Sequence, residues 1–151
     1  MRIRDHLAAL AMSLALLLTL PAQAQQFEQV GDYQIHYSAV NTSFLPKAVA
    51  REHGIQRSQV MALLNVSVLK ELEDGSTRPV TASVEGRIAG LEGDDPTPLS
   101  FRSLRIDDIP SQVAVFRIHE DEPMRFDLRV RYDRNAEPAE VSFIQRFYID
   151  R

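Results

Sequence analysis

Apolar residues occupy every second position in several stretches of this chain, and this period of two restricts its fold more than any other feature. The clearest stretch runs from Met124 to Tyr132, where apolar residues alternate with arginine and aspartate. Successive side chains of a strand point to opposite faces, so the stretch predicts a strand with one buried and one solvated face. A chain of such strands must pack its apolar faces together.

Similar alternation, or a short apolar run bounded by turn residues, predicts further strands along the chain. These are the segments 33–39, 60–68, 80–88, 99–106, 112–119 and 141–149. The polar segment from Gln25 to Gly31 precedes them as a possible added edge strand. Together the segments predict about seven strands in an all-β, immunoglobulin-like antiparallel sandwich. A closed barrel of the lipocalin type is the alternative.

The turn residues Asp74 and Gly75 lie between two strands whose apolar residues fall at even positions. Because Asp-Gly is a strong turn sequence, we expect 60–68 and 80–88 to form one long antiparallel hairpin. In that hairpin Asn65 would face Glu85 or Arg87. Gly86 and Gly90 predict a bulge or a bend within the second strand.

The segment between the first two strands predicts a short helix on a long crossover. Pro46 suits the first turn of a helix over Lys47–His53, and Gly54 suits the left-handed residue that follows it. Ile55 would then fold back onto Ala50, as in the usual capping motif with a glycine.

The first 24 residues have the pattern of a secretory signal peptide. Arg2 and Arg4 precede an uncharged apolar run over Leu7–Leu20, and Ala22-Gln23-Ala24 supplies small residues at a cleavage site. We therefore expect residues 1–24 to be removed and residues 25–151 to form a single exported domain. The apolar run is shorter than a membrane span requires, so we expect no integral membrane segment after this removal.

Composition limits the classes of function. The chain carries 17 Lys and Arg against 21 Asp and Glu, and this acidic balance argues against nucleic acid as a general partner. It has no cysteine, which excludes disulfides, a lipidated N-terminal cysteine and a cysteine nucleophile. There is also no Gly-x-Ser-x-Gly sequence. We expect no enzyme, no catalytic residue and no cofactor.

Metal binding is not predicted either. The three histidines after the N-terminal segment are separated by many residues and none forms a His-x-x-x-His or Glu-x-x-His pair. The acidic stretches around residues 92–95 and 120–122 lack the alternating ligands of a calcium loop. We interpret both stretches as solvated turns.

The sequence after residue 24 resembles a small family of exported bacterial proteins known as domain of unknown function 4426. The resemblance lies in His36-Tyr37, Asn41-Thr42-Ser43-Phe44-Leu45-Pro46, Gly54-Ile55, Arg57-Ser58, Asn65, Phe143 and Gln145-Arg146-Phe147-Tyr148. It covers essentially the whole domain after residue 24. The resemblance implies a β-sandwich in the periplasm of a Gram-negative cell, and it implies no activity. The polar positions of the family correspond here to His36, Ser43, Arg57 and Asn65.

The crossover provides the candidate contact surface. Phe44 and Leu45 are an aromatic and an aliphatic residue near Arg57 and Ser58, and interfaces are often anchored by aromatic residues and arginine. Asn65 is the fifth candidate, because it lies on the polar face of a strand whose other face is apolar. The alternative is structural: Phe44 and Leu45 plug the open end of the sandwich, and Arg57 binds loop carbonyls.

A second surface of interest is the row of arginines 125, 129 and 131 on one strand face. Such a row could meet an anionic partner, but Asp127 and Glu140 nearby favour an ion-paired face in water.

We therefore predict an exported, periplasmic, non-enzymatic protein that binds a protein or a cell-envelope component. The alternatives are a small-ligand or glycan-binding domain, or an enzyme of an unrecognised type. A third hypothesis is strand addition at an edge near Gln25–Gly31 or Leu99–Ile106.

Overall fold

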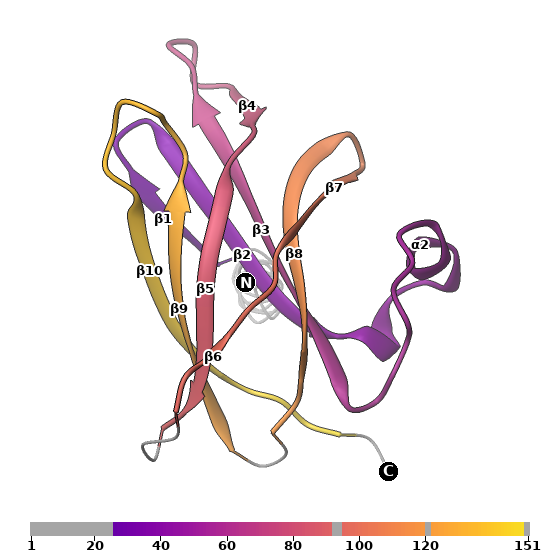
Figure 1. The fold of residues 1–151 in the computed structure, drawn as a ribbon. Helices are drawn as coiled ribbons and strands as arrows, with labels where there is room; N and C mark the ends of the chain where they lie inside the picture. The colour runs from indigo at the N-terminus through magenta and orange to yellow at the C-terminus, as the bar shows by residue number, and fades with distance from the viewer. Residues whose placement is uncertain (1–25, 92–94, 120–121, 150–151) are drawn as a thin grey trace, which may run out of the picture.

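Two antiparallel sheets pack face to face in the computed structural model, which describes residues 26–91, 95–119 and 122–149 (Figure 1). The predicted sandwich is confirmed. The predicted signal peptide at residues 1–24 lies outside the described residues, as do parts of the two acidic stretches. No helix in the described part of the chain is long and apolar enough to cross a bilayer.

The larger sheet has six strands in the order β1-β2-β3-β8-β7, with β4 paired to β3, and the smaller has four in the order β10-β9-β5-β6. The strands are β1 (Gln26–Val30), β2 (Tyr33–Asn41), β3 (Met61–Glu71), β4 (Thr77–Val80), β5 (Ser83–Gly90), β6 (Thr97–Pro98), β7 (Arg102–Ile106), β8 (Ile109–Arg117), β9 (Pro123–Arg131) and β10 (Ala139–Arg146). The additional strands, compared with the expected seven, are short. The predicted leader strand is β1, and β1 and β7 form the two edges of the larger sheet.

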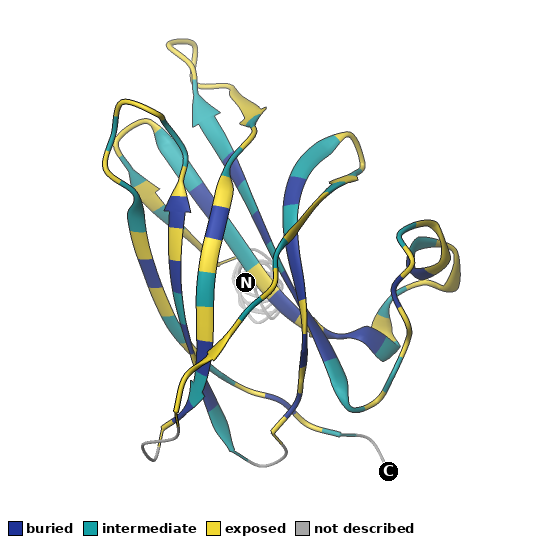
Figure 2. Cartoon of the chain, in the orientation of Figure 1, coloured by how far each residue is buried: buried dark blue, intermediate teal, exposed yellow. Residues whose placement is uncertain are grey.

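The period of two places the apolar face of each sheet inside. Figure 2 shows buried and exposed residues alternating along β9, as the sequence predicts. Phe126 of β9 is fully buried and stacks on Phe143 of β10, with 4.6 Å between the ring centroids. It also meets Phe116 of β8 edge to face at 5.3 Å. Since β8 belongs to the larger sheet, these rings join the two sheets.

The prediction that residues 60–68 and 80–88 form one long hairpin is wrong. β3 pairs with β4 only over Val68–Glu71, and the chain then crosses to the smaller sheet, where β5 pairs with β9. The alternation keeps its phase because the inner faces of both sheets border the same core. Phase alone therefore does not show that a chain changes sheets. Asn65 consequently lies between Ser38 and Val113, and not opposite Glu85 or Arg87.

Of the bulge or bend predicted at Gly86 and Gly90, the bulge is absent, because the register of β5 with β9 is continuous from Ser83 to Gly90. Close packing explains Gly86. A Cβ atom at Gly86 would lie 2.6 Å from Cδ2 of Leu128 and 3.1 Å from the carbonyl oxygen of Asp127. Leu128 is buried in the core, so it has little room to move.

We expect Gly86→Ala to lower the free energy of unfolding by about 1–3 kcal/mol, because the added methyl group overpacks the core beside Leu128. Urea denaturation followed by circular dichroism measures this change. Ser83→Ala, at an exposed position of the same strand, is the control and is expected to stay within about 0.5 kcal/mol of the wild type. A Gly86→Ala protein as stable as the control would contradict the packing argument.

Candidate functional site

The crossover between β2 and β3 packs on the outer face of the larger sheet. It contains a 3-10 helix, η1 (Thr42–Phe44), and an α-helix, α2 (Lys47–Glu52), and it projects beside β8 in Figure 1. A second apolar cluster lies under it. Its buried members are Ala50, Ile55, Leu63 and Val113, with Leu45, Leu104 and Ile106 partly buried against them.

The end of α2 follows the predicted capping motif. Gly54 has φ of 65°, the Gly54 N–H donates to the Arg51 carbonyl, and the Ile55 N–H donates to the Ala50 carbonyl at 2.8 Å. Ile55 and Ala50 are both buried in the second cluster. The sequence therefore predicted this helix and its end correctly, apart from the 3-10 turn before it.

Hydrogen bonds hold the crossover in place. The fully buried Thr42 hydroxyl donates to the Ser58 carbonyl at 3.1 Å and accepts from the Ser58 N–H at 2.9 Å. The Arg57 guanidinium donates to the Ser43 carbonyl at 2.8 Å. Arg102 of β7 donates to the carbonyl of His53, just after α2, at 2.8 Å.

These bonds give different roles to the predicted contact residues. Arg57 binds a loop carbonyl, and Ser58 holds Thr42 and also accepts from the Val60 N–H at 3.2 Å. Leu45 is partly buried in the second cluster. Phe44 is 69% exposed, so it does not plug the end of the sandwich and stays available to a partner. Partner binding by these residues remains a prediction.

A groove lies next to the crossover on the same outer face. It has a volume of about 290 Å³ and runs between β2, β3 and the β7–β8 hairpin. Polar side chains on its walls come from His36 and Ser38 of β2, Asn65 and Ser67 of β3, and Ser111 of β8. Ile106 lines the groove and also packs in the second cluster, so the groove and the crossover form one continuous surface.

Asn65 is the residue of this groove that most needs explanation. Its Oδ1 atom is buried and has no hydrogen-bond partner among the described residues. A buried acceptor without a donor costs about 1–3 kcal/mol, and buried polar groups are normally paired. Asn65 lines the groove, and its buried oxygen becomes open to a ligand donor only when the side chains around it move.

His36 is fixed by neighbours on both sides. Its ring stacks on Phe27 with 5.1 Å between centroids, and its Nε2 lies 2.9 Å from Oε1 of Gln34. The Gln34 amide in turn donates to Glu71 at 2.8 Å. Partial burial lowers the pKa of His36 below its ordinary value. Burial raises the pKa of the neighbouring Tyr37, and the Glu28 carboxylate adds to that shift.

The turn at the tip of the β7–β8 hairpin places a carboxylate at the groove. Because Ile106 pairs with Ile109, the loop has two residues, Asp107 and Asp108, with φ of 52° and 62°. Positive φ at both positions is typical of a type I′ turn, and aspartate tolerates it better than most residues. Asp107 lines the groove.

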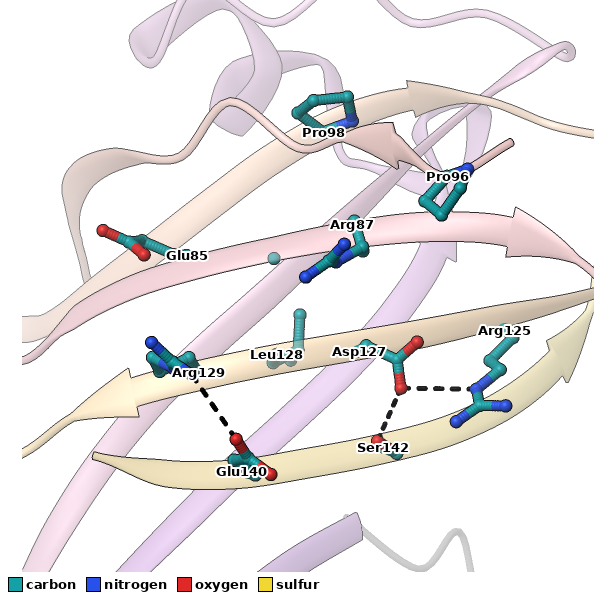
Figure 3. Close-up of a pocket in the computed structure, with 11 residues that line it drawn as sticks. Glu85, Arg87, Pro96, Pro98, Arg125, Asp127, Leu128, Arg129, Glu140 and Ser142 are labelled. Carbon is teal, nitrogen blue, oxygen red and sulfur yellow. Dashed lines mark hydrogen bonds and ion pairs between the residues drawn. The ribbon is translucent and has the colours of Figure 1, made fainter. Parts of the chain in front are cut away.

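The outer face of the smaller sheet carries a wider and shallower hollow, shown in Figure 3, of about 710 Å³. Several of its charged side chains pair with one another. Asp127 accepts from Ser142 at 2.7 Å and from Arg125 at 3.3 Å, and Arg129 lies 3.6 Å from Glu140. This agrees with the interpretation of the arginine row as an ion-paired face in water, where such pairs contribute little free energy.

The described residues contain no group of three or more His, Cys, Asp or Glu side chains placed to hold a metal ion. Of the groove residues, Asn65 was a predicted contact residue and His36 a polar position of the family resemblance; the others were not predicted. The polar side chains at 36, 38, 65 and 67 alternate on two strands, which is a detectable pattern. The local sequence, however, does not indicate that the β7–β8 hairpin supplies the opposite wall of the groove.

Comparison with known proteins identifies one family. A family model described as "Domain of unknown function (DUF4426)" matches residues 27–150. The chain is similar to the crystal structure of a DUF4426 family protein from Pseudomonas aeruginosa PAO1, with 28% identity and a TM-score of 0.72 over 86% of this chain and 99% of that chain. No curated protein matches the chain.

FetP from uropathogenic Escherichia coli shares the fold at much lower identity. The protein isolated after expression in the E. coli periplasm is 9% identical, with a TM-score of 0.61 over 85% of this chain and 96% of that chain. A copper-bound variant of FetP gives 9% identity and a TM-score of 0.61, over 83% and 96% of the two chains. This likeness concerns the fold alone.

We expect Thr42→Val to lower the free energy of unfolding by about 1–3 kcal/mol, because it leaves the N–H and carbonyl of Ser58 unpaired at nearly constant side-chain volume. Urea denaturation measures the loss. Ser43→Ala is the matched control, since only the backbone carbonyl of Ser43 is used by Arg57. If Thr42→Val and Ser43→Ala are equally stable, the crossover is not held as described.

Proposed function

This chain belongs to the DUF4426 family, and from that premise we propose that it is an exported, periplasmic, non-enzymatic binding protein. Its ligand is a protein or another component of the cell envelope. The binding surface is the outer face of the larger sheet, made of the groove at Asn65 and the adjoining crossover with Phe44. Export is supported by the N-terminal pattern of basic residues, apolar run and Ala-Gln-Ala site.

The observation that carries this proposal is the buried, unpartnered Oδ1 of Asn65 in the lining of the groove. Phe27 stacks on His36, which lines the groove, and Val40 of β2 and Phe44 of η1 are exposed as well. An apolar rim beside an unsatisfied polar floor suits a partner that brings both an apolar contact and a hydrogen-bond donor. The ion-paired outer face of the smaller sheet lacks this combination.

A small ligand or a glycan is the second candidate. The groove volume of about 290 Å³ lies near the lower end of ligand-binding sites, roughly 300–1,000 Å³, and several polar groups converge on it. The copper-bound state of FetP gives no comparable support for copper here, because the described part of this chain has no group of three or more His, Cys, Asp or Glu side chains placed to hold a metal ion.

Site-specific photo-cross-linking in the native host tests the proposed surface. A photoreactive residue in place of Ser38 or Phe44 is expected to give a discrete cross-linked product from the periplasm. The same residue at Ser142, on the opposite outer face, is the control and is expected to give none. Adding Asn65→Ala to the Ser38 version is expected to reduce the product about tenfold, as the loss of one buried hydrogen bond predicts.

Cross-linking from Ser142 alone would contradict the proposal. So would a product from Ser38 that is unaffected by both Asn65→Ala and Phe44→Ala, because neither the groove nor the crossover would then contribute.

A further inference from the structure

We propose that the groove recognises a positively charged hydrogen-bond donor, a primary ammonium or a guanidinium, carried on a short alkyl stem. This inference rests on the proposed function, because it names the chemistry that the same groove binds. It follows from the acceptors, the charge and the apolar wall of the groove.

Among the described residues, the groove is lined by the acidic side chain of Asp107 and by no lysine or arginine. Asp107 makes no hydrogen bond or ion pair within the described part of the chain and is exposed at the tip of its turn. A groove with one free carboxylate and no basic side chain favours a cation over an anion.

Asn65 supplies the first acceptor. Its Oδ1 atom has no donor, and no other described residue donates to it. Its cross-strand partners are Ser38 and Val113; Val113 has no polar side chain, and the Ser38 hydroxyl does not donate to it in this structure. A ligand donor that reaches this oxygen after a shift of the neighbouring side chains would satisfy it, because the oxygen accepts no existing hydrogen bond.

His36 also lines the groove, and its neighbours determine which of its two ring nitrogens carries no proton. The Gln34 amide nitrogen donates to Glu71, so Oε1 of Gln34 faces His36 and accepts from it. His36 Nε2 must then carry the proton, which leaves Nδ1 as a bare acceptor in the neutral ring. Burial lowers the pKa of this ring and so favours the neutral form.

The remaining wall is apolar. Leu69, Ile106 and Ile109 line the groove together with the acceptors. Aliphatic side chains beside a charged head group suit the alkyl stem of a lysine-like or arginine-like group, which buries its methylenes and keeps its charge near polar atoms. A compact inorganic cation would leave this wall unused.

A nuclear magnetic resonance titration of the protein purified from the periplasm tests the inference. The probe is 1,5-diaminopentane, and its neutral and acidic counterparts of similar length are 1,5-pentanediol and glutarate. We expect the diamine to shift the amide resonances of Asn65, Ser67 and Asp107, and we expect the two counterparts to bind at least tenfold more weakly.

Two variants locate the binding. Asp107→Asn keeps a residue that tolerates positive φ and removes the charge, so the fold is retained. Asn65→Ala removes an oxygen that has no partner in the protein, so little stability is lost. Each is expected to weaken diamine binding about tenfold. Ser142→Ala on the opposite face is the matched control and is expected to leave it unchanged.

A second arm distinguishes the two sources of such a group. Nα-acetyl-lysine N-methylamide, whose side-chain amine is free, represents a lysine of a partner protein. Binding at least tenfold tighter than the diamine would identify a protein side chain as the natural ligand, and weaker binding would identify a free amine.

The inference is overturned if pentanediol or glutarate binds as tightly as the diamine. It is also overturned if the diamine causes no shift up to about 10 mM, or if Asp107→Asn and Asn65→Ala both bind normally. In these cases, persistent cross-linking from Ser38 would retain the proposed function and reject only the amine chemistry. If neither diamine binding nor cross-linking from Ser38 is observed, the proposed function is rejected as well.

Discussion

Aromatic packing around Phe126 is the interaction on which the rest of the structure depends. This ring is fully buried, lies parallel to Phe143 within 5°, and meets Phe116 of the opposite sheet edge to face. Aromatic pairs of this kind stabilise a core beyond the area they bury. Because large side chains fill the space between the sheets, both hollows described above lie on outer faces. These hollows are therefore features of the surface of the sandwich and not of its core.

The two outer faces differ in how their polar atoms are satisfied. On the smaller sheet, acids and arginines alternate across strands, and the resulting pairs remain in contact with water. On the larger sheet, the crossover covers Leu63 and Val113, and the neighbouring groove leaves the Asn65 oxygen unpaired. Exposed ion pairs require no partner, whereas a buried acceptor gains free energy when a donor arrives. This contrast favours the larger sheet as the binding face.

Much of the fold follows from local sequence. Alternation at 124–132 identifies β9, and Gly54 with Ala50 and Ile55 identifies the end of α2. The assignment of strands to sheets does not follow, because Val84 and Ile88 keep the same phase in either sheet. The neighbours of Asn65 were mispredicted for that reason. The groove also depends on the Asp107-Asp108 turn, whose role beside β3 is set by long-range pairing.

Hydroxyl-radical footprinting in a periplasmic extract of the host tests most directly whether the larger sheet is the binding face. The protein has exposed reactive side chains on both outer faces: Phe27 and Phe44 on one, Ile144 on the other. If the larger sheet is the binding face, the extract slows oxidation of Phe27 and Phe44 and leaves that of Ile144 unchanged. Protection of Ile144 without protection of Phe27 or Phe44 would contradict this assignment of the binding face.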